Sequence, residues 1–408
     1  MAKITDLTEL TVIDPDDLLY VVHAPATAAA SMKAKAFRFG AAPSTNGFRL
    51  TLAPLNPVYA PQPATPSSTD TTADTCTFAA AHGWESGTIV TVSATIGGLT
   101  AGSRYFLNKV STTVVSFHTT VAAALAGTSK VDLTATMTSQ VIPSGISNST
   151  IYLTPFNGAQ IGLYNGSSWT QLASAEVSLA LGTLTSDKNY DVFAYSNVGV
   201  LTLELLAWTS DTVRATALVR QDGVWVKTGA LTRRYIGTIR TDSTTTTIME
   251  TGGARTTVSA KLFVWNADNR LDTSFFRFEQ TGSWAWDTLS YHQANASTAN
   301  QIEVIAGLAE AMIDIELTVL AVNTATGKVL SVALGEDSTT IPAPGSLKSI
   351  VVTQSTGPEY NLPARLRKIV PLGYHYYSWL EYGGGATSNF YSDDAALRRY
   401  GLTGSIRA

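Results

Sequence analysis

The sequence is poor in cysteine and histidine, and both shortages narrow the chemistry available to it. A single cysteine, Cys76, excludes a disulfide within the chain and a cysteine-based zinc site. The histidines are not spaced like a metal-binding pair on one strand or helix. They are His23, His82, His118, His292 and His375. We therefore expect neither a bound metal nor a cofactor.

Charge is also scarce. Charged residues make up 14% of the chain, against roughly 25% in ordinary soluble domains. The net charge is −4, so the chain offers no basic face to a phosphate backbone, and nucleic acid is not an expected partner. Weak repulsion between copies instead favours a permanent oligomer.

Long apolar runs are missing as well. The N-terminus, Met1 to Asp6, has no apolar segment of the kind found in secretory signals. No run approaches the roughly 18 apolar residues that a membrane-spanning helix needs. We expect synthesis in the host cytoplasm and no membrane insertion.

Catalytic motifs are absent from the sequence. It contains no Gly-x-Ser-x-Gly elbow, no Walker loop and no His-Glu-x-x-His. A carboxylate pair about 5–9 Å apart could cleave glycosides. The candidates Glu204, Glu279, Asp287 and Asp314 are scattered along the chain, and nothing in the sequence brings two of them together. We expect no catalytic residues and no enzyme.

What is present is a β-rich chain in four parts. Residues 1–40 form a small N-terminal segment in which Leu18, Leu19, Tyr20, Val21 and Val22 read as a buried strand. Residues 41–70 are rich in proline and predict a stiff, extended linker. Residues 71–143 predict a small β domain, and residues 144–408 a large C-terminal β domain.

The C-terminal part carries the clearest strand pattern. Ile313, Ile315, Leu317 and Val319 alternate with polar residues, as in a strand with one buried face. Asp222-Gly223 predicts a tight hairpin turn because both residues tolerate positive φ. Many short strands with regular turns predict an all-β fold, with a β-sandwich or jelly roll as the large domain. Short helices are expected only at 119–126, ended by Gly127, and at 394–400.

Aromatic residues are the most suggestive feature for binding. They gather in two places: Trp284, Trp286, Tyr291 and His292, then Tyr374, Tyr376 and Trp379 with their neighbours. Flat rings stack on sugars and also anchor protein interfaces. Alternate positions of an apolar strand normally face a core, so packing in a core or subunit interface is the alternative to glycan contact.

Three stretches resemble bacteriophage virion proteins. Ile4–Leu10 followed by Asp16–Val22 is similar to the N-terminal segment of many tail-fibre and related appendage proteins. Phe78–Trp84 and Gly98–Gly102 resemble small β modules repeated across phage structural proteins. A third resemblance, to an uncharacterised phage structural domain, is carried by Tyr190–Phe193, Arg233–Arg240, Val264–Asn266 and Gly373–Tyr376.

The resemblance implies a location in the virion, attachment to other virion proteins of the tail or capsid through the N-terminal segment, and self-assembly, usually as a homotrimer. It implies no catalytic residues. The leading interpretation is therefore a tail-fibre or spike subunit that presents a β head for host adsorption, with host surface glycan as a possible partner. The alternatives are a capsid decoration or head-fibre (cement) protein and a polysaccharide-degrading tail spike.

Overall fold

Strands make up nearly all of the regular structure, as the sequence predicts for an all-β protein. The computed structural model describes residues 43–252, 258–352, 359–385, 388–392 and 399–408. The N-terminal segment 1–40, with its predicted strand at Leu18–Val22, lies outside the described residues, as does most of the helix expected at 394–400. No helix in the described part of the chain is long and apolar enough to cross a membrane.

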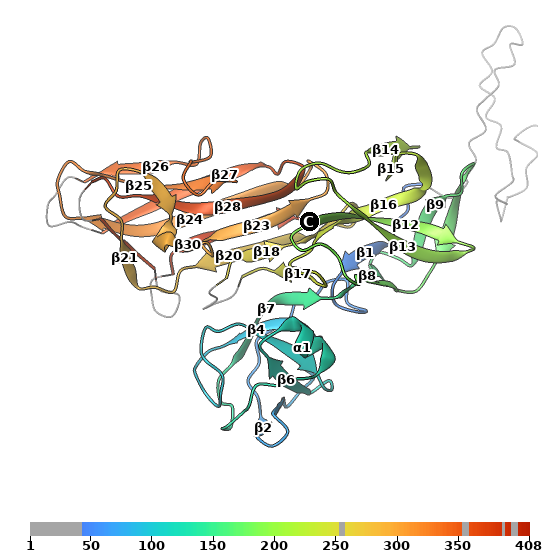
Figure 1. The fold of residues 1–408 in the computed structure, drawn as a ribbon, viewed down its shortest axis with the longest axis horizontal. Helices are drawn as coiled ribbons and strands as arrows, with labels where there is room; N and C mark the ends of the chain where they lie inside the picture. Colours follow the sequence, from blue (N-terminus) through green and yellow to red (C-terminus); the bar gives the residue numbers. More distant parts are fainter. Residues whose placement is uncertain (1–42, 253–257, 353–358, 386–387, 393–398) are drawn as a thin grey trace, which may run out of the picture.

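A small β unit projects from the middle of an elongated sandwich (Figure 1). Its buried residues, including Cys76, Trp84 and Phe117, form a separate apolar cluster. Its elements are β2 (Ser68–Asp70), β3 (Thr75–Thr77), β4 (Thr88–Val92), β5 (Tyr105–Lys109), β6 (Val114–His118), α1 (Val121–Ala126) and β7 (Val141–Asn148). The Thr120 side chain caps the start of α1, and Gly127 ends it at a φ of 67°, which confirms the predicted helix and its stop.

The small unit and the sandwich share one hydrogen-bonded sheet. Its order is β2-β3-β6-β5-β4-β7-β17-β18-β23-β28-β25-β26, with β22 also paired to β28. Strand β7 pairs with β4 on one side and β17 on the other, so the sheet runs without a break from one unit into the next. The strands beyond β7 are β17 (Thr247–Glu250), β18 (Ala260–Leu262), β22 (Tyr291–Gln293), β23 (Gln301–Ala306), β25 (Val329–Glu336), β26 (Lys348–Val351) and β28 (Gly373–Tyr382).

A six-stranded sheet covers the far half of this long sheet. It comprises β20 (Asp272–Phe278), β21 (Ser283–Ala285), β24 (Met312–Asn323), β27 (Tyr360–Ile369), β29 (Ser388–Tyr391) and β30 (Gly401–Arg407). In its central strand, β24, the residues Ile313, Ile315, Leu317 and Val319 are fully buried, which confirms the predicted alternation. They belong to the largest apolar cluster of the described residues.

The other end of the sandwich is built from three further sheets. One contains β12 (Asn189–Asn197), β13 (Val200–Ala207), β14 (Leu218–Gln221), β15 (Val224–Lys227), β16 (Ala230–Arg240) and β19 (Val264–Asn266). The other two are β1 (Phe48–Thr51) with β8 (Thr150–Pro155) and β11 (Val177–Ala180), and β9 (Gln160–Tyr164) with β10 (Trp169–Ala173). Asp222 and Gly223 join β14 to β15 with φ angles of 49° and 87°, as predicted for a tight hairpin.

The segment expected to be an extended linker is partly folded. Strand β1 lies between Pro43 and Pro54, pairs with β8, and is buried at all of its positions. Its residues, Phe48, Arg49, Leu50 and Thr51, contain no proline, so every backbone donor is available for pairing. Proline frequency over 41–70 therefore hid a strand whose own sequence is β-prone.

Candidate functional site

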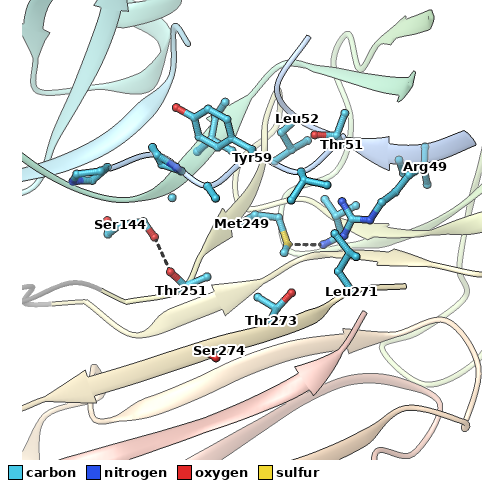
Figure 2. A pocket seen from close by; sticks show the side chains of 18 of the residues that line it. Arg49, Thr51, Leu52, Tyr59, Ser144, Met249, Thr251, Leu271, Thr273 and Ser274 are labelled. Carbon is cyan, nitrogen blue, oxygen red and sulfur yellow. Dashed lines mark hydrogen bonds between the residues drawn. The ribbon is translucent and has the colours of Figure 1, made fainter. Parts of the chain in front are cut away.

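A cleft opens where the small unit, strand β1 and the sandwich meet (Figure 2). It encloses about 360 Å³ and is lined mainly by apolar atoms. One wall is β1 with the following turn and Val58–Gln62, another is β7 with Met249 and Thr251, and the third is the start of β20. Pockets at the junction of structural units are common ligand sites.

Arg49 brings a positive charge to this cleft. Its guanidinium is nearly buried and donates to the backbone carbonyls of Asn269, Pro57 and Ala408 at 3.2, 2.7 and 3.5 Å. Burial lowers the pKa of Arg49 to about 10, still far above neutrality. Arg49 thus stays charged while it ties β1 to the turn after it and to the end of β30.

Tyr59 forms the roof of the cleft and connects it to the small unit. Its hydroxyl contacts the Thr88 hydroxyl and accepts a hydrogen bond from the Glu85 backbone at 3.2 Å. Burial raises the pKa of Tyr59 to about 12. Nearby, the Trp84 indole donates to the Gln62 carbonyl at 3.1 Å. These contacts hold Val58–Gln62 against the small unit.

The floor of the cleft includes the edge of strand β20. Asp272 and Ser274 are exposed there, and Thr273 and Leu271 are half-buried. The Phe276 N–H, one step further along the same edge, donates to the Thr251 carbonyl at 2.9 Å. The cleft is therefore open at the point where β20 has lost its neighbour.

The aromatic residues singled out in the sequence lie elsewhere, along β28 and its neighbours. Trp379 is fully buried and meets Trp284 across the sandwich, with ring centroids 5.7 Å apart. Trp286 is half-buried and stacks on His292, with centroids 3.7 Å apart. Trp379 is thus a core residue, and the first aromatic group packs at one end of the sandwich.

The second aromatic group is divided between the two ends of β28. Tyr374 lies at the opposite end from Trp379, donates to Glu303 at 2.8 Å, and has the Arg240 guanidinium 3.8 Å above its ring. Tyr376 is half-buried on the same half of the strand. Tyr291 instead joins the first group, contacting Tyr382 and hydrogen bonding to Ser331 at 2.6 Å.

Glu381 sits at the centre of the first aromatic group, and sequence reasoning did not find it. Its carboxylate is fully buried, and its Oε2 accepts from the Trp284 indole at 2.7 Å. His292 Nε2 lies 3.8 Å from the same oxygen. Oε1 has no hydrogen-bond partner of good geometry among the described residues. A glutamate at an inward position of an aromatic strand was the available signal.

Burial also sets the protonation of this pair. Desolvation raises the pKa of Glu381 to about 8, and Glu279 raises it further while the Trp284 indole lowers it. Desolvation lowers the pKa of His292 to about 4. At neutral pH the carboxyl group keeps its proton, and the imidazole is neutral.

The described residues do not assemble metal-binding groups of three or more His, Cys, Asp or Glu. Of the scattered carboxylates, Glu204 pairs with Lys227 and Arg233, and Asp314 pairs with Arg365. Glu279 accepts hydrogen bonds from Asn300 and the Thr281 backbone at 2.9 and 3.0 Å. These contacts give each of the three a role in the fold.

Comparisons with known proteins leave the family open. No family model matches the chain, and no curated protein matches it significantly. Eiger TNF from S. frugiperda is 8% identical with a TM-score of 0.23, over 34% of this chain and 92% of that one. The infectious bursal disease virus Gt strain structure is 9% identical with a TM-score of 0.22, over 90% of this chain and 78% of that one. Latent PorU from Porphyromonas gingivalis is 7% identical with a TM-score of 0.24, over 54% of this chain and 22% of that one. Similarities this weak assign neither a family nor a function.

Proposed function

We propose that this chain is a structural subunit of a bacteriophage particle, a tail-fibre or spike subunit that presents its β-sandwich to the host surface. The proposal starts from the N-terminal stretches Ile4–Leu10 and Asp16–Val22, which resemble the attachment segments of phage appendage proteins. The low charge of the chain adds to it, because weakly charged copies associate readily.

The structural observation that carries the proposal is the unbroken sheet. Thirteen strands connect the small unit to the sandwich through backbone hydrogen bonds, with β7 at the crossing (Figure 1). A ladder of this kind resists bending at the junction, whereas a peptide linker would act as a hinge. A body without a hinge suits a permanent part of a particle that has to hold its shape.

Adsorption is tested by competition. Host cells are incubated with the purified full-length protein before the phage that encodes it is added, and free phage is counted. We expect adsorption to fall as the protein concentration rises. An adsorption rate that does not change while labelled protein remains in solution would contradict a role in host recognition.

Substitution of the half-buried aromatic residues locates the receptor contact. Trp286→Ala and Tyr376→Ala lie at opposite ends of β28, so loss of competition in one variant identifies the end that contacts the host. Far-ultraviolet circular dichroism checks that both variants remain folded. Equal competition by both variants would return these residues to a packing role.

A further inference from the structure

Strand β20 has an unpaired backbone edge facing the cleft. Leu271 and Ala408 exchange both of their backbone hydrogen bonds, at 2.9 and 3.0 Å. In an antiparallel pair, hydrogen-bonded and non-bonded positions alternate. Thr273 and Phe275 therefore bond to β30, and the N–H and C=O groups of Asp272 and Ser274 point away from it.

The next position on this edge shows what such groups can do. Phe276 also points away from β30, and its N–H bonds to the Thr251 carbonyl at 2.9 Å. None of the described residues bonds to the outward groups of Asp272 and Ser274, which line the cleft. Four backbone groups in a row are thus open to an added strand.

The walls around this edge indicate the kind of ligand. Tyr59, Met249, Leu271 and Ile146 give the cleft an apolar lining that admits hydrophobic side chains (Figure 2). Open backbone groups beside apolar pockets recognise an extended peptide, because the ladder bonds its main chain and the pockets hold alternate side chains. The combination favours a peptide strand over a free small molecule.

We propose that this cleft receives residues 18–22 of a second copy of the chain as an added strand on β20. Leu18, Leu19, Tyr20, Val21 and Val22 form an apolar, β-prone run ahead of the described body, and their side chains suit the lining. The proposal rests on the self-assembly that the proposed function assumes, and it names the surface involved.

The point where the chain enters the body favours a second copy over the same one. Arg234 donates to the carbonyls of Pro43 and Thr45 at 2.9 and 2.8 Å, and to that of Gly162 in β9 at 2.9 Å. The preceding segment therefore starts beside β9 and β16, at the far end of β1 from the junction with the small unit (Figure 1). From there it is directed towards a neighbour.

Disulfide trapping tests this contact directly. One full-length variant carries Ser274→Cys and another Tyr20→Cys, and the two are mixed and mildly oxidised. The native Cys76 is fully buried and contributes little background. We expect a mixed disulfide dimer on a non-reducing gel. Ser167→Cys, an exposed site on the β9–β10 turn, is the matched control and should give none.

Two results would overturn the proposal. The first is a cross-link no stronger than that of the Ser167→Cys control. The second is a disulfide that forms only within one chain when both cysteines are placed in the same molecule and diluted. The experiment uses purified protein alone, so its result is independent of whether the chain is found in phage particles.

Proline substitution gives a second readout. Ser274→Pro removes the outward N–H that the added strand would use, whereas Ser274→Ala keeps it. We expect Ser274→Pro to weaken self-association at least tenfold in sedimentation velocity, and Ser274→Ala to leave it unchanged. Equal association of the two variants would contradict strand addition at this edge.

Discussion

At the scale of single residues, Glu381 is the most unusual group. It is fully buried beside Trp284, Trp379 and His292, and its shortest ion-pair distance is 3.8 Å, to a histidine that is neutral at pH 7. A buried carboxylate without a cation is unstable in its charged form, so the group retains its proton. The fold therefore binds a proton that the unfolded chain releases.

This proton makes stability depend on pH. The pKa of Glu381 is raised from 4.5 to about 8, so its contribution is fully present below pH 4.5 and is lost as the pH rises to about 8. Between pH 6.5 and 8 we expect the free energy of unfolding to fall by roughly 1.4 kcal/mol per pH unit from this group. Denaturant unfolding at a series of pH values measures the slope.

Glu381→Gln provides the comparison, because glutamine keeps the shape of the side chain without the titration. Its slope over the same pH range should be clearly smaller, and its stability at pH 8 higher, than in the wild type. Glu316→Gln, at an exposed position of β24, is the control and should keep the wild-type slope. An unchanged slope in Glu381→Gln would show that the carboxyl group is ionised in the fold.

At the scale of elements, the hairpins differ in how well their residues suit the turn. The β12–β13 turn places Val198 at a φ of 51° with its side chain almost fully exposed, whereas the β14–β15 turn has Asp222 at 49°. A β-branched residue is strained at positive φ, while Asp and Asn tolerate it. The first turn is thus a weak point in an otherwise regular sheet.

Replacing this valine should stabilise the protein. We expect Val198→Asn to raise the free energy of unfolding by about 1 kcal/mol, because it relieves the backbone strain and removes exposed apolar surface. Asp222→Asn, in the turn that already suits its residues, should change stability by less than about 0.5 kcal/mol. Thermal unfolding of both variants checks the difference. No gain at Val198 would mean that the turn is relaxed.

Local patterns in the sequence predicted local elements well. The Asp222-Gly223 turn, the short helix ended by Gly127 and the alternation in β24 are each set by residues close together in the chain, and the structure confirms them. Strand β1 was missed because its position depends on pairing with β8, about a hundred residues later. The prolines on either side of it concealed the strand.

The candidate sites were harder to predict than the elements, because both depend on distant contacts. Neighbouring aromatic residues in the sequence predicted one surface, yet Tyr374 and Trp379 lie on opposite halves of β28. Glu381 acquires its character from Trp284 on the opposing sheet. The cleft at the junction arises from β1, β7 and β20, which no local pattern relates to one another.

At the scale of the whole molecule, the junction between the small unit and the sandwich is held by a buried ion pair. Arg104 lies 3.0 Å from Glu250 on β17, and Ser144 donates to the same carboxylate at 3.1 Å. Burial raises the pKa of Glu250, and Arg104 partly opposes this. The pair fixes the small unit at the point where the shared sheet crosses from β7 to β17.

Removing one partner should loosen this junction. We expect Arg104→Met to lower the free energy of unfolding by roughly 2 kcal/mol or more, because Glu250 would remain buried without its cation. Arg104→Met combined with Glu250→Met should recover most of the loss. Denaturant unfolding of the single and double variants gives the coupling. Equal losses in both would show that the pair contributes little beyond packing.

The central claim is that this chain is a structural part of a phage particle. Cryo-electron microscopy of the purified phage, with the β-sandwich and its projecting small unit traced in the map, tests it most directly. The account predicts density for this body at the tail, with its N-terminal end directed into the particle. Density on the capsid lattice would identify a decoration protein instead, and a particle without this chain would contradict the account.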